Sequence, residues 1–124
     1  MNPSLLHQMR ATGGVLYLGS PFTGYRGELD EAARRASYAS GELHALGIVH
    51  FCPISHGYMA AEARGLDHRD HGFWMPHCIA HLTRCSGLVV LMLPGWETSI
   101  GLSEERRIAE DRNLPIMFMS PPDA

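Results

Sequence analysis

The sequence predicts a three-layer α/β/α sandwich built on a small, mostly parallel sheet of four or five strands. Short apolar runs alternate with amphipathic helical segments, so we expect parallel strands joined by right-handed crossovers, with helices on both faces. Leu88 to Leu93 is apolar at every position, which is typical of a strand covered on both faces. The 124 residues suffice for one domain with a single core. No repeat or linker divides residues 1–124.

The first half of the chain supplies two of the expected strands. Residues 1–13 show no clear hydrophobic period and are expected to form an irregular or weakly helical lead-in. Val15 to Gly19 is a short apolar run that is expected to be a strand. The strand should end there, because Ser20 and Pro21 follow it directly. Glu28 to Leu46 carries alanine and leucine along one helical face. Ile48 to Cys52 is expected to be the second strand.

The second half continues the alternation. Ile54 to His71 is rich in glycine, histidine and charge, so we expect a long functional loop with at most a helical turn. Phe73 to Arg84 is expected to be helical, with Pro76 tolerable only in its first turn. Ser99 to Arg112 is a further helix, and Pro115 to Met119 is the last strand.

In such a sheet, ligands bind beyond the carboxyl ends of the strands. Three segments follow the expected strands and form this rim: Ser20 to Gly27, Pro53 to Tyr58, and Pro94 to Ser103. They are polar and contain glycine and proline, so the chemistry is expected to collect there. Tyr17, on the first strand, would point into the core or up at the ligand, depending on the pleat.

The rim segment after the strand from Leu88 has the most specific pattern. Trp96 could provide an aromatic wall, and Thr98 or Ser99 could cap the next helix with its first N–H groups facing an anion. Glu104 and Glu105 lie in the first turns of that helix, where a carboxylate can act as nucleophile or general base. The alternative interpretation is a simple capping box, which leaves the preceding Gly-Trp unexplained.

The other two rim segments carry weaker signals. The sequence YLGSPFTGYRG could hold a phosphate or sugar hydroxyl through backbone N–H groups, or it could be a plain strand-ending turn. His56, within PISHGY, could hydrogen-bond a ligand or transfer a proton, or it could simply bond to nearby backbone.

Several histidines suggest a rival hypothesis. His77, His81 and Cys85 recur every fourth residue, so on a helix they would share one face and could bind zinc with an open fourth position. His68 and His71 could add to this set. None of the common zinc spacings is present, so a polar or interfacial face is the alternative.

Charge and composition narrow the class of partner. The net charge of −3 gives no reason to expect a nucleic-acid polymer or an anionic membrane. No apolar run is long enough to cross a bilayer, and the N-terminus lacks the pattern of a signal peptide. Three cysteines without disulfide spacing suit a reducing compartment, so a cytoplasmic protein is expected. Cys52 and Cys78 are expected to be small core residues.

Taken together, the segments resemble a known family. A tyrosine-bearing strand ending LGSPF, then PISHGY, a tryptophan-bearing helix, and LVVLMLPGWETSIGLSEERRIAE are similar to the nucleoside 2-deoxyribosyltransferase-like superfamily. Within that superfamily the chain looks like its short DUF1937 type, from about Val15 to Phe118. The resemblance implies a flavodoxin-like sandwich and cleavage of the N-glycosidic bond of a 2′-deoxyribonucleoside or its 5′-monophosphate. The sugar would pass to water or to another base.

The resemblance also implies roles for particular residues. The family's catalytic glutamate lies four residues after a loop glycine and four before a helix alanine. With Gly101 and Ala109 as these markers, it corresponds to Glu105, which would attack or stabilise the anomeric carbon. Tyr17 would orient this carboxylate, and Ser99 would meet the 5′ end of the substrate. The expected substrate-binding residues are Gly19, Ser20, Pro21, Phe22, His56, Trp96, Ser99 and Gly101.

The chain departs from the family in one respect. An aspartate usually lies on the helix before the third strand, where it helps to protonate or hold the leaving base. The corresponding place is near Ile79, where there is no carboxylate. His77, His81 or Asp70 could take this role.

The expected protein is therefore a glycosidase or deoxyribosyltransferase that needs no cofactor and no metal. It would act on a small nucleoside or nucleotide as a homodimer or larger assembly, because sites of this superfamily often borrow residues from a neighbouring subunit. The alternatives are a catalytically silent nucleotide-binding or signalling module, and a zinc-dependent enzyme.

Overall fold

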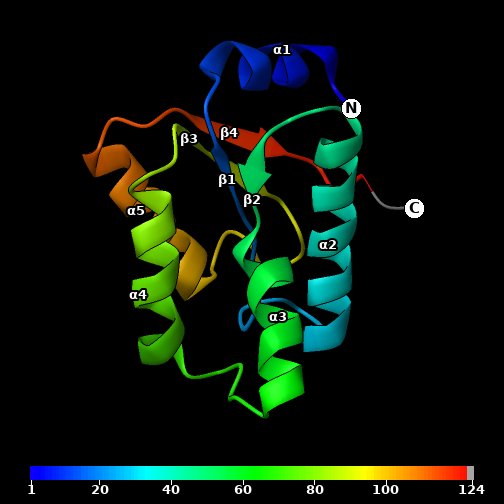
Figure 1. The fold of residues 1–124 in the computed structure, drawn as a ribbon, viewed down its shortest axis with the longest axis vertical. Coiled ribbons are helices and arrows are strands. Elements are labelled where there is room, and N and C mark those ends of the chain that lie inside the picture. The colour runs from blue at the N-terminus through cyan, green and yellow to red at the C-terminus, as the bar shows by residue number, and fades with distance from the viewer. Residues whose placement is uncertain (123–124) are drawn as a thin grey trace.

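The computed structural model, which describes residues 1–122, contains a sheet of four parallel strands flanked by helices (Figure 1). The strands are β1 (Leu16–Gly19), β2 (His50–Phe51), β3 (Gly87–Leu91) and β4 (Ile116–Met119). Their order across the sheet is β2-β1-β3-β4, and every neighbouring pair is parallel. This confirms the predicted flavodoxin-like α/β/α sandwich.

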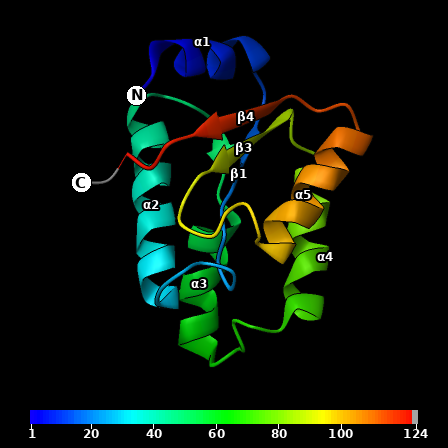
Figure 2. The same cartoon turned by 180° about the vertical axis from the view of Figure 1, so that it is seen from behind.

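The helices lie on both faces of the sheet. They are α1 (Pro3–Thr12), α2 (Leu29–Ala45), α3 (Pro53–Arg64), α4 (His71–Leu82) and α5 (Ile100–Asp111). Figures 1 and 2 show α4 and α5 together on one side and α2 on the other, with α1 crossing the end of the sheet. Helix α3 packs against α2 and approaches β1. Among residues 1–122, no helix is long and apolar enough to span a bilayer.

The pleat of β1 divides the core into two parts. Leu16 and Leu18 face the side covered by α1 and α2, where they join a cluster with Leu43 and Val89. Tyr17 points to the other side, beneath α4 and α5, and is fully buried. Because successive side chains of a strand point to opposite faces, this register directs the tyrosine hydroxyl toward α5.

The chain from β3 to β4 follows the prediction closely. A buried strand is followed by a turn, helix α5 and a last strand. Ser99 is the N-cap, and its side chain accepts a hydrogen bond from the N–H of Leu102 at 3.3 Å. Of the two expected caps, Thr98 or Ser99, the structure therefore selects Ser99.

The prediction of an irregular lead-in was wrong, because residues 3–12 form α1. The side chain of Asn2 accepts hydrogen bonds from the N–H groups of Ser4 and Leu5, and Pro3 occupies the first helical position. Leu5 and Met9 are buried against the sheet. The N-terminal helix is thus part of the core.

The prediction of a long loop from Ile54 to His71 was also wrong over most of that segment. Residues from Pro53 form α3, which ends at Gly65 in the left-handed conformation (φ 73°). Pro53 suits the first turn, since its missing N–H is not needed there. Only the residues between α3 and α4 remain a connection.

Helix α4 begins earlier than predicted. Asp70 caps it by accepting a hydrogen bond from the N–H of Phe73 at 3.2 Å, so the helix starts at His71. Pro76 therefore lies inside the helix and not in its first turn. A proline at this position cannot donate a helical hydrogen bond. The expectation that Pro76 would lie in the first turn was therefore wrong.

Candidate functional site

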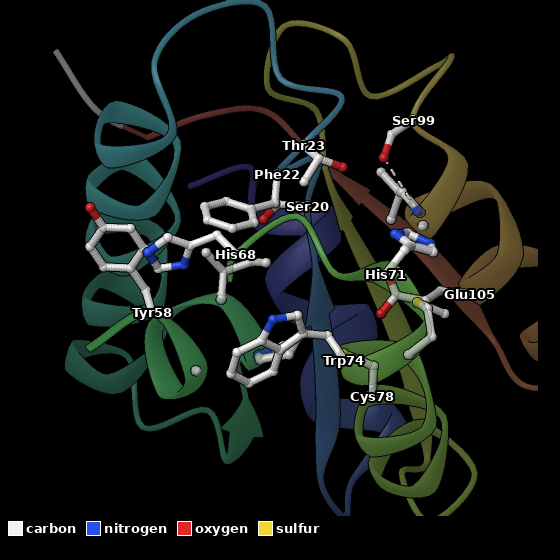
Figure 3. Close-up of a pocket in the computed structure, with 16 residues that line it drawn as sticks. Ser20, Phe22, Thr23, Tyr58, His68, His71, Trp74, Cys78, Ser99 and Glu105 are labelled. Atoms are coloured by element: carbon white, nitrogen blue, oxygen red, sulfur yellow. Dashed lines mark hydrogen bonds between the residues drawn. The ribbon is translucent and has the colours of Figure 1, made fainter. Parts of the chain in front are cut away.

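A pocket opens at the carboxyl ends of β1 and β3 (Figure 3). The connections after these two strands leave in opposite directions, to β2 and to β4, so the pocket lies at the topological switch point of the sheet. Its walls come from the loop after β1, the first turns of α3, helix α4 and the start of α5. The lining residues are Ser20, Phe22, Thr23, Pro53, Ile54, Gly57, Tyr58, His68, His71, Trp74, Met75, Cys78, Ser99, Gly101, Leu102 and Glu105.

Glu105 is the carboxylate of this pocket. Its side chain is only 5% exposed and lies on the second turn of α5, facing β1. The hydroxyl of Tyr17 donates a hydrogen bond to its Oε2 atom. Gly19 gives the carboxylate room, because a Cβ there would lie 3.4 Å from Oε1 of Glu105 and 3.0 Å from Leu102. The structure therefore joins the predicted glutamate, tyrosine and glycine in one cluster.

Burial governs the protonation of this cluster. Desolvation raises the pKa of Glu105 from 4.5 to about 7, although the hydrogen bond from Tyr17 opposes the rise. Burial and the charge of Glu105 raise the pKa of Tyr17 well above its usual value, so the phenol stays protonated and donates. The same two causes raise the pKa of Cys78 to about 11, which makes its thiol a poor nucleophile at neutral pH.

The neighbouring glutamate is in a different environment. Glu104 is half-buried and forms an ion pair with Arg107, whose hydrogen bond lowers the pKa of the carboxyl group. It does not line the pocket. The choice of Glu105 over Glu104 therefore agrees with the geometry.

One end of the pocket is rich in hydrogen-bonding groups. Ser20 is 6% exposed, and its Oγ atom has no hydrogen-bond partner among the described residues. Ser99 lines the same pocket. The N–H groups of Ile100 and Gly101 belong to the first turn of α5, where no helical carbonyl can accept from them. This end can bind an anion or a hydroxyl.

Aromatic rings form the opposite side, which we call the aromatic wall (Phe22, Tyr58, His68 and Trp74). In Figure 3 they are grouped on one side of the pocket, and Glu105, His71 and Ser99 on the other. Phe22 meets Tyr58 edge-on, with 6.0 Å between ring centroids. Gly57 lets Trp74 approach, because a Cβ there would lie 3.4 Å from the indole. Such a wall suits a planar, apolar-faced ligand.

Two histidines line the pocket. His68 stacks on Tyr58 and forms a hydrogen bond between its Nε2 atom and Oε2 of Glu62 at 2.9 Å. His71 is the first residue of α4 and lies against Gly101, where a Cβ would be 3.1 Å from its ring. One imidazole therefore lies on each side of the pocket (Figure 3).

Five predicted substrate or catalytic residues line the pocket: Ser20, Phe22, Ser99, Gly101 and Glu105. Tyr17 and Gly19 contact Glu105 from the strand below. Pro21 is buried in the same loop without lining the cavity. Of these residues, Ser20, Pro21, Phe22, Ser99 and Gly101 belong to the rim segments after β1 and β3.

Four other predicted residues lie outside the pocket. Trp96 packs against Phe118 and beneath the guanidinium of Arg106. Asp70 is exposed and serves as the cap of α4. The other two, His56 and His77, stack on each other beside β2, with 5.5 Å between ring centroids. The expected proton donors His77 and Asp70 are therefore not brought to the pocket.

The histidines beside β2 form what we call the edge stack (His56, His77 and His81 over Phe51). His81 lies flat on Phe51, with 4.0 Å between centroids and 9° between planes, and His77 is 4.7 Å from His81. Among residues 1–122, no group of three or more His, Cys, Asp or Glu side chains is placed to hold a metal ion. The His77, His81 and Cys85 face thus gives the zinc hypothesis no geometric support.

The sequence did not lead us to predict the pocket residues that α4 supplies. His71, Trp74, Met75 and Cys78 line it from α4 and follow the spacing i, i+3, i+4, i+7 of one helical face. The sequence contains this spacing. The prediction instead followed the i, i+4, i+8 pattern of His77, His81 and Cys85, which lies on another face of the helix. Tyr58 was hidden because α3 was expected to be a loop.

Comparison with known proteins bears on the family. A search of the curated proteins finds no match. Residues 14–121 match the family described as "Domain of unknown function (DUF1937)". This range includes β1, the pocket-lining residues and β4. The chain therefore belongs to the DUF1937 family.

Proposed function

We propose that this protein cleaves the N-glycosidic bond of a 2′-deoxyribonucleoside or its 5′-monophosphate, with Glu105 as the catalytic carboxylate. The observation that carries the proposal is a buried glutamate that lines the pocket and accepts a hydrogen bond from a buried tyrosine. Cleavage of a glycosidic bond passes through an oxocarbenium-like transition state, which a carboxylate in a water-poor site can stabilise.

The chemistry assigned to Glu105 requires its ionised form. The carboxylate would attack the anomeric carbon, or stabilise its positive charge, as the electron pair of the C–N bond leaves with the base. Because the pKa of Glu105 is about 7, the active form grows as the pH rises through neutrality. Tyr17 would hold the carboxylate in one orientation through its hydrogen bond.

The two ends of the pocket match the two ends of such a substrate. The aromatic wall would take the planar base, and Glu105 would face the sugar between the ends. The unpartnered Ser20 hydroxyl, Ser99 and the first turn of α5 would bind the 5′-hydroxyl or 5′-phosphate. The helix start favours the charged phosphate over a neutral hydroxyl.

The wider setting is also part of this proposal. Similarity of the segments around Tyr17 and Glu105 to the nucleoside 2-deoxyribosyltransferase-like superfamily supports the reaction class and a homo-oligomeric assembly. All three cysteines are free, which agrees with action in the reducing cytoplasm. Whether water or a second base accepts the sugar depends on which of them enters the pocket.

The test is to incubate the protein with a panel of deoxyribonucleosides and their 5′-monophosphates and to measure free base. We expect base release by the wild type and a loss of roughly 100-fold to 1,000-fold or more in Glu105→Gln. Glu104→Gln is the matched control and should keep wild-type activity, since Glu104 does not line the pocket and pairs with Arg107. Equal release by Glu105→Gln and wild type would contradict the mechanism. Binding of a monophosphate without any release would indicate a silent binding module.

A further inference from the structure

His68 is the histidine of the aromatic wall. Its Nε2 atom is hydrogen-bonded to the Glu62 carboxylate at 2.9 Å. The ring of Tyr58 stacks on it at 4.7 Å and 16°, and Phe22 meets it edge-on at 5.7 Å. Three contacts from α3 and the loop after β1 therefore fix the imidazole in the pocket wall.

The pair of Glu62 and His68 has the chemistry of a proton donor. The hydrogen bond from His68 lowers the pKa of Glu62, so the carboxylate stays ionised and accepts from the Nε2 atom. Tyr58 also donates to Glu62, at 3.3 Å. With Nε2 engaged by Glu62, the second ring nitrogen, Nδ1, is the one left to serve a ligand.

The position of His68 matches the need of the reaction. A nucleobase is a poor leaving group unless a proton neutralises the charge that develops on it. A base lying against the aromatic wall would be next to His68, while the sugar faces Glu105 at the other side (Figure 3). His71 is exposed and lies at the carboxylate side against Gly101, and among residues 1–122 no carboxylate hydrogen-bonds to its ring.

We propose that His68 is the general acid that protonates the departing base, with Glu62 as its positioning residue. This inference rests on the proposed function. As the C1′–N bond breaks, its electron pair goes to the base, and the Nδ1 proton of the His68 imidazolium moves to a base nitrogen or oxygen. Glu105 forms the bond to C1′. Water then attacks C1′, the Glu105 bond breaks, and the released proton returns to His68.

The experiment compares an ordinary base with one that leaves without a proton. Suitable pairs are deoxyguanosine 5′-monophosphate with its positively charged 7-methyl derivative, and deoxyuridine 5′-monophosphate with its 5-fluoro derivative, whose base is more acidic. His68→Asn should lose about 100-fold or more in kcat on the ordinary base. It should lose far less on the activated partner. Retained activity on the activated partner also shows that the variant is folded.

Control variants separate this role from others. His7→Asn, an exposed histidine on α1, should match the wild type on both substrates. Glu62→Gln should keep part of the activity and lose more on the ordinary base than on its activated partner, because the imidazole loses the carboxylate that holds its Nε2 atom. A merely structural role of Glu62 would lower both activities equally.

Three results would overturn the proposal. They are equal losses by His68→Asn on both members of a pair, no loss on the ordinary base, or selective loss in His71→Asn instead of His68→Asn. If the wild type releases base from no substrate of either pair, the proposed function itself fails and this inference falls with it. The wild-type result therefore distinguishes the two failures.

Discussion

Titratable groups lie on both sides of α4, and they respond to pH in opposite directions. On the pocket side, burial raises the pKa of Glu105 to about 7. On the other side, burial and the neighbouring charges of His77, His56 and Arg84 lower the pKa of His81 in the edge stack. In both cases the low-dielectric surroundings disfavour the charged form, which is the anion in one and the cation in the other.

The comparison teaches that desolvation of an acid and of a base gives opposite pH dependences of stability, although Glu105 is buried and His81 only half-buried. For Glu105, the folded state holds a proton that the unfolded chain gives up between pH 4.5 and about 7, so rising pH lowers the free energy of unfolding. For His81, the unfolded chain takes up a proton more readily, so stability is lost as the pH falls below 6.5. Replacing either side chain should remove only the pH dependence of stability that this side chain causes.

The largest expected effect on stability is that of Glu105→Gln. A pKa raised from 4.5 to about 7 corresponds to a cost of about 3 kcal/mol for keeping the carboxylate charged in the fold. The glutamine avoids this cost and can still accept from Tyr17. We therefore expect the variant to be more stable than the wild type above pH 7 by up to about 3 kcal/mol, with no difference below pH 4.5.

Urea unfolding at pH 4.5, 6 and 8 measures this difference. The matched control is Glu104→Gln, whose sign should be opposite, because Arg107 lowers the pKa of Glu104 and makes its charge stabilising. A Glu105→Gln variant that is less stable than the wild type at pH 8 would show that the carboxylate is not desolvated as described.

The second effect is that of Tyr17→Phe. It removes the donor to Glu105 from a fully buried position. A hydrogen bond to a charged group is worth about 1.5–3 kcal/mol, so a loss of roughly 10-fold to 100-fold in kcat/KM should follow. The low-pH limb of the rate profile should also move to higher pH, because this hydrogen bond lowers the pKa of Glu105 and its loss raises that pKa. A profile that keeps its limb would mean that Tyr17 does not set the ionisation of Glu105.

The smallest effect is that of His81→Phe, which tests the edge stack. Phenylalanine can keep the stacking on Phe51 without a charge. The drop in Tm on acidification from pH 7.5 to 5.5 should be smaller than in the wild type, by no more than about 4 °C. Base release should not change, since the edge stack does not line the pocket. An unchanged drop in Tm would show that the edge stack does not titrate against folding.

The sequence predicted the parts of the fold that local patterns determine. The buried strands, helix α2 and the turn capped by Ser99 follow from hydrophobic spacing and capping chemistry. Helix α3 was missed because Gly57 and the proline and histidine around it weaken any helical pattern. Gly57 is needed because the Trp74 ring of α4 lies against it, a contact distant in sequence.

The candidate site was predicted only where one segment carries its own signal. Resemblance identified Glu105 and Tyr17, and the pleat of β1 explains how they meet. The eight histidines could not be sorted from sequence. The roles of His71, His77 and His81 depend on which face of α4 meets α5 and which meets β2, and tertiary packing decides that. His77 and Asp70 were expected to be proton donors because the sequence does not show how α4 packs.

One contiguous stretch of chain, from Pro53 to Cys78, supplies the pocket residues of both α3 and α4. The carboxylate and its tyrosine come from elsewhere, on α5 and β1. Under the proposed function, most of the aromatic wall is therefore encoded apart from Glu105 and Tyr17. Exchanging this stretch between relatives would replace Tyr58, His68 and Trp74 and leave Glu105, Tyr17 and Phe22 in place, which makes it the natural unit for altering specificity.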